Sequence, residues 1–163
     1  MSEQNFLSPI NFRFVINRLP NVAFYIQQAS IPGISMIPTE SPSPFAQIYR
    51  HGDRLLFNEF SIIIRVDEDM ESYREIYDWM TGVASPEGFD GYETISQGTE
   101  GIYSDATLTI LNSSQNPNIE VTYRDMFPIQ LGDVSFNTTA TDLEFATCDI
   151  TFRYARFDIK KLG

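Results

Sequence analysis

Apolar and polar residues alternate along most of this chain, which is the pattern of β-strands that bury one face and expose the other. In the segment NFRFVINR the side chains of Phe12, Phe14 and Ile16 share one face. The predicted strands are Asn11–Arg18, Val22–Ala29, Ile34–Ile37, Arg54–Val66, Ile102–Leu111, Ile119–Tyr123, Met126–Asn137 and Leu143–Ile159. The first two strands are separated by a short turn containing Pro20, so we expect them to form a hairpin.

The segment DEDMESYREIYDWMTG has a different period and predicts an amphipathic helix over Asp69–Met80. Its apolar face consists of Met70, Tyr73, Ile76, Tyr77 and Met80. Asp67 or Asp69 is expected to cap the first turn, and Gly82 is expected to end the helix. Three adjacent carboxylates could also bind a metal ion, but the alternating spacing of a calcium loop is absent. A helix cap is therefore the preferred interpretation of Asp67-Glu68-Asp69.

Two long segments are predicted to be loops, one over residues 38–54 and a Gly-rich one over residues 83–101. In the first loop Pro38, Pro42 and Pro44 withdraw backbone donors, which makes a central strand improbable there. A loop of this length in a compact domain is usually functional or disordered. The first loop also carries apolar side chains, namely Phe45, Ile48 and Tyr49. We therefore interpret it as an arm that docks on a partner.

These elements predict a mainly β fold, an antiparallel β-sandwich or barrel of about seven or eight strands with one α-helix. The 163 residues suit a single domain over 1–163, long enough to bury roughly two thirds of the unfolded chain's surface. No apolar run reaches the roughly 18 residues of a membrane helix, so we expect no membrane anchor. The N-terminus MSEQNFLSP lacks the features of a signal peptide, and synthesis in the cytoplasm is expected.

The charge balance argues against general nucleic-acid binding, because 11 Lys and Arg against 22 Asp and Glu give a net charge of −11. Lysine is nearly absent, and the only two are Lys160 and Lys161. Lysines commonly protect exposed sheet edges, so we expect the edges of this β-rich chain to lack that protection. One explanation is an acidic, salt-adapted surface. The other is that much of the surface is buried against further subunits, where Lys is depleted.

The sequence offers little material for catalysis. His51 is the only histidine and Cys148 the only cysteine, which excludes zinc sites with Cys and His spacing and intrachain disulfides. A Ser-His-Asp triad would have to use His51, which lies beside Arg50, and no phosphate-binding or dinucleotide-binding glycine motif is present. We therefore predict that the chain is not an enzyme and uses no metal or cofactor. A β-barrel that binds a small apolar ligand is the alternative of a different class.

The order of several short motifs is more specific than any one of them. Ile31-Pro32-Gly33 is followed by a long loop, by Gly52-Asp53-Arg54, by the strand Phe57–Val66, and by the helical segment Tyr73–Trp79. Phe127-Pro128 and the closing segment Phe145–Tyr154 follow at the C-terminal end. In this order and spacing, from about Asn11 to Phe157, the chain resembles the tail tube proteins of contractile-tailed bacteriophages. Tube initiators and the tube of type VI secretion systems share that fold.

The resemblance implies a structural role in a virion. Hexameric rings would form when a sheet from each subunit joins its neighbours into one barrel, and the rings would stack into a conduit for DNA. An acidic lumen would repel the phosphates of that DNA. The expected partners are further copies of the chain, the tail sheath, the baseplate or initiator, and a tape measure protein. The compact length favours the main tube subunit, with a baseplate tube initiator or a type VI secretion-like tube protein as alternatives.

The loop at residues 38–54 would then reach across the contact between rings, and the predicted helix would lie at the periphery or between subunits. Arginines near the loop are expected to pair with carboxylates of neighbouring subunits. Solvated surface charges are the alternative interpretation. The candidate subunit-interface residues are Phe45, Ile48, Tyr49, Arg50, Asp53, Arg54 and Arg65.

Overall fold

The computed structural model describes residues 6–84, 88, 101–139 and 144–163. Most of the predicted Gly-rich loop at 83–101 lies outside the described residues. The elements are β1 (Phe12–Ile16), α1 (Val22–Tyr25), β2 (Ile26–Ala29), β3 (Ile34–Met36), β4 (Thr39–Ser41), β5 (Ile48–Arg50), β6 (Leu55–Phe57), β7 (Phe60–Arg65), α2 (Glu71–Val83), β8 (Ser104–Leu111), β9 (Pro117–Leu131), β10 (Thr147–Arg153) and β11 (Arg156–Lys161).

Seven strands form one antiparallel sheet in the order β1-β8-β9-β10-β7-β2, with β11 paired to β9. The first part of β9 pairs with β8 and β11, and its last residues pair with β10. Between these parts Asp125 has a φ of 52°, and its backbone N–H donates to the carboxylate of Asp105 at 3.1 Å. The long strand changes direction there and passes from one layer to the other.

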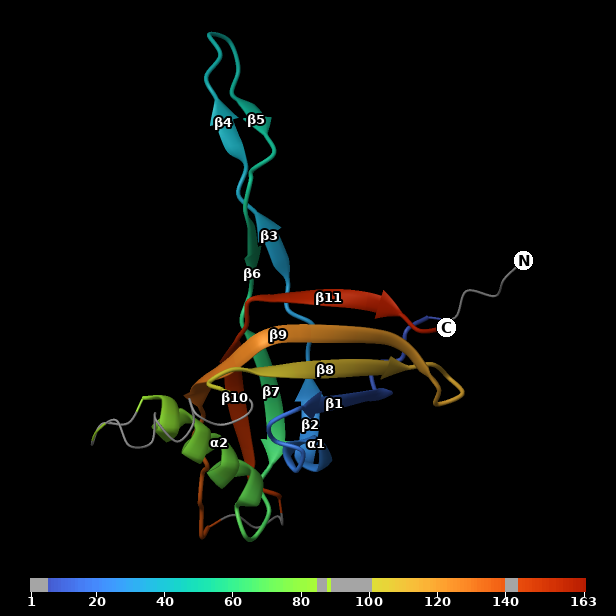
Figure 1. Cartoon of the computed structure of the whole chain (residues 1–163), viewed down its shortest axis with the longest axis vertical. Helices are drawn as coiled ribbons and strands as arrows, with labels where there is room; N and C mark the ends of the chain where they lie inside the picture. The colour runs from blue at the N-terminus through green and yellow to red at the C-terminus, as the bar shows by residue number, and fades with distance from the viewer. Residues whose placement is uncertain (1–5, 85–87, 89–100, 140–143) are drawn as a thin grey trace.

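The two layers are sandwich-like, with β1, β8, β9 and β11 running across the direction of β2, β7 and β10 (Figure 1). The core lies between them and is rich in aromatic side chains. Tyr123 on β9 is fully buried and lies 4.6 Å from the ring of Phe60 on β7, centroid to centroid. The described strands do not close into a barrel. The prediction of a mainly β, antiparallel fold is therefore confirmed in its sandwich form.

The helix α2 is confirmed, with a shift of its bounds and of its buried face. It begins after its N-cap residue, Met70, so neither Asp67 nor Asp69 holds the N-cap position. The carboxylate of Asp67 nevertheless accepts the backbone N–H of Glu71 at 3.0 Å and so satisfies one donor of the first turn. Gly82 lies inside the helix and does not end it. The buried residues of α2 are Ser72, Ile76, Trp79 and Gly82, whereas Tyr77 is exposed. The face that α2 buries is therefore shifted by about one residue from the apolar face that the sequence predicted.

Four predicted strand assignments are wrong in connectivity. The predicted strand Arg54–Val66 is two strands, β6 and β7, which belong to different sheets. The expected hairpin of the first two strands does not form: β1 pairs with β8, β2 pairs with β7, and Val22–Tyr25 is a short helix. The predicted strand Leu143–Ile159 is two strands, which turn between Tyr154 and Ala155. The predicted strands Ile119–Tyr123 and Met126–Asn137, by contrast, both belong to the single strand β9. Alternation identifies the buried face of a segment, but partners distant in sequence decide how it pairs.

The expectation that the sheet edges lack lysine is wrong for one edge. Both Lys160 and Lys161 lie on β11, an edge strand, so this edge carries the protection that we expected to be missing. The other edge of the same layer is β1, which has none. No helix in the described part of the chain is long and apolar enough to span a membrane. Within the same residues, no three His, Cys, Asp or Glu side chains are grouped so as to hold a metal ion.

Candidate assembly interface

A long hairpin projects from one end of the molecule (Figure 1). We call residues 34–57 the arm and the rest of the described chain the body. The arm consists of two short ladders, β3 with β6 and β4 with β5. The sequence predicted a strand-free loop over residues 38–54, so the small ladder β4–β5 is a correction. The prolines lie outside that ladder, where no strand donor is needed.

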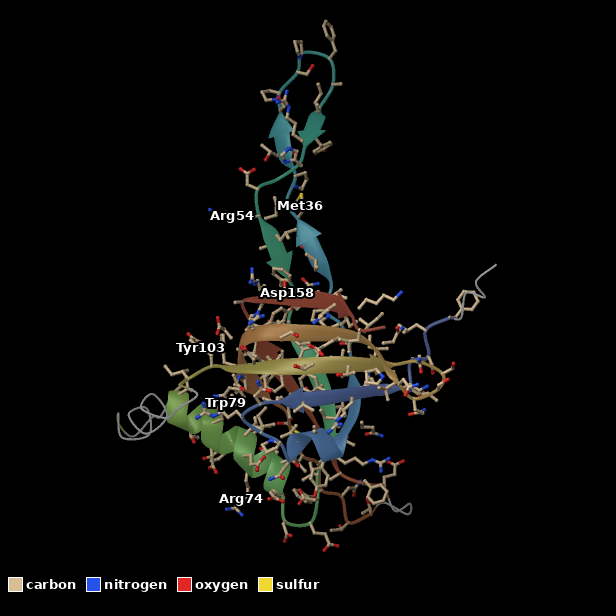
Figure 2. All side chains as sticks on the ribbon, turned by 45° about the vertical axis from the view of Figure 1, so that its right-hand side comes forward. Met36, Arg54, Arg74, Trp79, Tyr103 and Asp158 are labelled. Atoms are coloured by element: carbon tan, nitrogen blue, oxygen red, sulfur yellow. The ribbon has the colours of Figure 1, made fainter. Side chains whose placement is uncertain are left out.

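The arm exposes a continuous set of large apolar side chains. They are Ile34, Met36, Ile37, Phe45, Ile48, Tyr49, Leu55 and Leu56, and Phe45 at the tip is 99% exposed. In Figure 2 Met36 and Arg54 are labelled on the arm, well away from the body. A two-stranded hairpin is at best marginally stable in water, and apolar patches of this kind usually mark an interaction site. The arm therefore has the composition of a surface that is covered in the working state.

The base of the arm is fixed to the body by backbone and aromatic contacts. The hydroxyl of Tyr154 donates to the carbonyl oxygen of Asn58 at 2.8 Å, and the Asn58 N–H donates to Gly33 at 3.1 Å. The ring of Phe57 lies 6.0 Å from that of Tyr154 and 5.4 Å from that of Phe157. These contacts hold the direction in which the arm leaves the body. The exposed ion pair of Arg153 with Glu59, at 2.9 Å, adds little stability.

The tyrosines beneath the arm predict how stability depends on alkaline pH. Burial raises the pKa of Tyr154 to about 12 against the opposing effect of Arg153, and burial also raises the pKa of Tyr123. The folded state thus holds these protons more tightly than the unfolded chain, in which tyrosine ionises near pH 10. Stability is full below about pH 10 and is lost as the pH rises toward the folded values.

We expect Tyr123→Phe/Tyr154→Phe to have a flatter decline of melting temperature between about pH 10 and 12 than the unsubstituted protein. Thermal unfolding at several pH values measures the slope. Losing the Tyr154 hydrogen bond lowers the melting temperature at all pH values. It therefore does not change the slope of melting temperature against pH, which is the quantity compared. Equal slopes in both proteins would contradict the assignment of alkaline instability to these two tyrosines.

Gly52 lies at the junction of the two ladders of the arm. Met36 pairs with Leu55, and Thr39 pairs with Arg50. Between these two pairs, the segment from Arg50 to Leu55 has two more residues than the segment from Met36 to Thr39. A Cβ atom at Gly52 would overlap the carbonyl oxygen of Ile37 and lie 2.9 Å from its carbonyl carbon. The close approach of the two backbones at this point thus requires glycine.

The structure brings six of the seven candidate interface residues together on the arm. These six are Phe45, Ile48, Tyr49, Arg50, Asp53 and Arg54, and all of them are exposed. The seventh, Arg65, lies on β7 in the body, where its guanidinium stacks over the ring of Phe145 at 5.1 Å. Among the described residues, none of the ion pairs includes Arg50, Asp53 or Arg54. Their charges are available to a partner.

Sequence reasoning missed the apolar residues in the lower half of the arm. Ile34, Met36, Leu55 and Leu56 were assigned to body strands, yet each is about half exposed. A signal was present at residues 55–57, where the run Leu-Leu-Phe interrupts the alternation that characterises the neighbouring strand. Apolar side chains on both faces of a two-stranded ribbon are not typical of a free surface strand.

Comparisons with known proteins agree with this fold. The sequence model described as phage tail tube protein matches residues 5–160. The chain is also 26% identical over 141 residues to the tail tube terminator protein of Enterobacteria phage T4, covering 84% of this chain and 77% of that protein.

Two solved structures have the same fold at low identity. The tube-terminating cap of the anti-feeding prophage aligns with a TM-score of 0.70 and 16% identity, over 99% of this chain and 95% of that one. A chain from the sheath–tube complex of an extracellular contractile injection system, PVC, aligns with a TM-score of 0.66 and 15% identity, over 98% and 95%. Since the family model spans nearly the whole sequence, the chain belongs to the phage tail tube protein family.

Proposed function

We propose that this chain is a structural subunit of the tube of a contractile phage tail, in which hexameric rings stack into a hollow conduit for DNA. The observation that carries the proposal is the arm, whose apolar side chains are left exposed by the rest of the described chain. Exposed apolar surface on this scale is typical of a site that contacts another protein. Family membership supports the same role.

Ring formation would use the free edges of the layer formed by β1, β8, β9 and β11. The strand β1 is an edge without lysine, and β11 is the opposite edge with Lys160 and Lys161. Pairing of β1 of one subunit with β11 of the next would satisfy both edges and extend the sheet around a ring. A ring of such head-to-tail contacts closes when the rotation between neighbours closes.

The solvent face of this layer would line the conduit. Thr107 pairs with Thr122 across β8 and β9, and Thr122 pairs with Asp158 on β11. Cations and acids on this face are close to one another, with Asp158 lying 3.7 Å from Arg124 and 3.9 Å from Arg156. We expect a contact of this face with DNA to carry no base specificity, because arginines on such a face would meet phosphates, which carry no sequence information.

The proposed location is the phage tail, and the proposed partners follow from the position of a tube in such a particle. They are further copies of the chain, the tail sheath, the baseplate or initiator, and a tape measure protein. The structural relatives support a tube assembly because two of them come from a sheath–tube complex and from a tube-terminating cap. The proposed role is non-enzymatic.

Replacing two exposed arm residues tests the proposal. We expect Tyr49→Ala/Arg54→Ala to fold normally and to assemble at least about tenfold less efficiently, because each substitution removes an exposed side chain with which the arm would contact a neighbouring subunit. Electron microscopy and sedimentation would measure rings and tubes. Asp78→Ala, on the exposed side of α2, is a matched control in the body. Tubes in normal yield from the double variant would remove the docking role of the arm.

A tube terminator is a second candidate role, favoured by the 26% identity to the terminator of phage T4. A terminator would form a ring that binds the end of a tube but would not extend it. The purified protein distinguishes the two roles by electron microscopy. Long tubes would support the tube subunit, and isolated rings that bind the ends of preformed tubes would support the terminator.

A further inference from the structure

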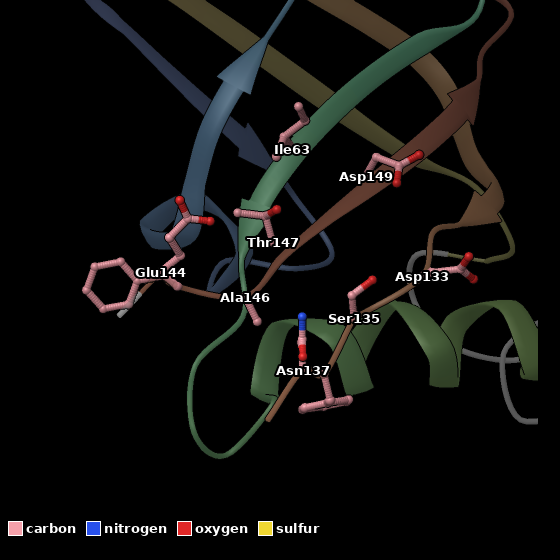
Figure 3. Close-up of a pocket in the computed structure, with 10 residues that line it drawn as sticks. Ile63, Asp133, Ser135, Asn137, Glu144, Ala146, Thr147 and Asp149 are labelled. Carbon is pink, nitrogen blue, oxygen red and sulfur yellow. The ribbon is translucent and has the colours of Figure 1, made fainter. Parts of the chain in front are cut away.

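The body has a groove of about 850 Å³ on the solvent side of β7 and β10 (Figure 3). One wall is the segment that follows β9, and the other is the segment that leads into β10. The side chains that matter to its chemistry are Ile63, Asp133, Phe136, Glu144, Phe145 and Asp149. We call this site the β7–β10 groove.

The groove combines apolar and acidic groups. Phe136 is 83% exposed, Phe145 is 73% exposed, and Ile63 on β7 is partly buried. Asp133, Glu144 and Asp149 supply three carboxylates, and none of them takes part in an ion pair with another described residue. The guanidinium of Arg65 stacks on the ring of Phe145, which lines the groove. An occupant that offers an apolar side chain beside a cation would complement these groups.

One face of the arm tip offers that combination. Paired residues of antiparallel strands share a face, so the register of β4 and β5 places Arg50 with Thr39 and Ile48 with Ser41. This face carries a cation, an isoleucine and no acid. The opposite face carries Glu40 beside Tyr49. The Ile48–Arg50 face is therefore the complementary one.

The arm and the groove lie at opposite ends of the long axis of the molecule. In Figure 1 the arm projects from one end, and the segments flanking β10 that line the groove lie near the other, below the start of α2. An arm therefore cannot fill the groove of its own chain. A contact between the arm of one copy and the groove of another relates the copies head to tail along this axis, and such contacts repeat without limit.

We propose that the β7–β10 groove receives the arm tip of the next copy along the long axis, with Ile48 against Phe136 and Phe145 and Arg50 against the carboxylates. The inference rests on the proposed tube function and names the surface that accepts the arm. The other exposed apolar segment, at Phe6, Leu7 and Ile10, is a poorer match because residues 6–12 carry no charge.

Cross-linking tests the contact directly. Gln47 at the arm tip and Ser135 beside the groove are both exposed, and replacing them removes none of the complementary groups. Gln47→Cys/Ser135→Cys is assembled and treated with a short bis-maleimide. The native Cys148 will not interfere, because it is 1% exposed and its burial raises the pKa of the thiol. We expect a ladder of covalent oligomers, while Gln47→Cys/Asp78→Cys and each single variant give none.

The possible results of this experiment distinguish failure of the groove contact from failure of the proposed tube function. Tubes without a ladder would overturn the groove and leave the tube function intact. Absence of rings and tubes from the unsubstituted protein would overturn the tube function and the groove together. A ladder from Ser8→Cys/Ser135→Cys, with none from Gln47→Cys/Ser135→Cys, would assign the groove to the N-terminal segment and overturn the proposal.

A charge exchange provides an independent test of the same contact. We expect Arg50→Glu to reduce tube yield at least about tenfold, because it sets a carboxylate against the acids of the groove. Adding Glu144→Arg should restore most of the yield, since every copy then carries both reversed charges. Adding Asp78→Arg, which makes the same charge change outside the groove, should restore nothing. Equal recovery with Asp78→Arg and Glu144→Arg would overturn the specific pairing.

Discussion

Gly52→Ala is expected to leave the body folded and to prevent tube assembly. The added Cβ would overlap the carbonyl oxygen of Ile37 and lie 2.9 Å from its carbonyl carbon. These are backbone atoms of the opposing strand, so the methyl group can be accommodated only if the two sides of the arm separate. The joint between the two ladders would open, and the tip would lose its fixed position relative to the body.

The effect on assembly is expected to be large because the same defect recurs at every contact. A loss of only about 1.4 kcal/mol per contact is tenfold in its equilibrium constant, and each added ring forms several such contacts. Thermal unfolding should change little, since of the arm only Phe57, at its base, packs against the buried core. Electron microscopy measures the assembly, and circular dichroism on heating measures the body.

Gly33→Ala is the matched control at the base of the arm. Its Cβ would meet only Nδ2 of Asn58, at 3.1 Å, and a flexible side-chain end of this kind can move by a few tenths of an ångström. We therefore expect Gly33→Ala to assemble nearly normally. Tubes in normal yield from Gly52→Ala would show that the junction can relax, and an equal defect in both variants would show that any added bulk is harmful.

The alternation of residues was a reliable guide to which side chains are buried. Ile62 and Ile64 on β7, and Ile150 and Phe152 on β10, are all at most 1% exposed, as their inward positions predicted. Pairing was less predictable, because β1 and β2 are close in sequence yet bind different partners. Local sequence patterns indicate which residues are buried, whereas the pairing partner of a strand depends on contacts with the whole chain.

The arm could be predicted from sequence and the groove could not. Three prolines and several apolar residues occur within one continuous segment at 38–54, so a projecting element was visible in the residues themselves. The groove combines Ile63 on β7 with the segments on either side of β10. Its acids all lie within residues 133–149, but Ile63 comes from a distant part of the chain and joins them only when β7 pairs with β10. No linear pattern indicates such a site.

Lysine content was informative, but its position changed the conclusion. Two lysines in the chain suggested that the sheet edges were unprotected, yet both lie on β11. The edge of that layer without lysine is β1, whose one charged residue is Arg13. A lysine-bearing edge discourages pairing with its own kind, because like charges face each other. Head-to-tail pairing of β11 with β1 avoids setting the lysines of one β11 against those of another.

The substitution that we expect to destabilise the protein most lies in the core. The ring of Phe60 on β7 lies 5.0 Å from Phe14, 4.6 Å from Tyr123 and 6.3 Å from Phe152. These neighbours lie on β1, β9 and β10, so one side chain joins both layers of the sandwich. Phe60 is fully buried. Removing it would leave a cavity lined by aromatic rings that are held in place by their own strands.

We expect Phe60→Ala to lower the free energy of unfolding by about 3–5 kcal/mol, a large part of the roughly 5–15 kcal/mol typical of a domain. Tyr123→Phe is the matched control in the same cluster, because its buried hydroxyl has no hydrogen-bond partner among the residues that the structure describes. Removing an unpaired hydroxyl restores lost desolvation energy, so this variant should be as stable as the unsubstituted protein or more stable. Urea unfolding of the three proteins measures both effects. A loss below about 1 kcal/mol in Phe60→Ala would mean that the layers collapse onto the cavity, and a clear loss in Tyr123→Phe would mean that the hydroxyl is hydrogen-bonded.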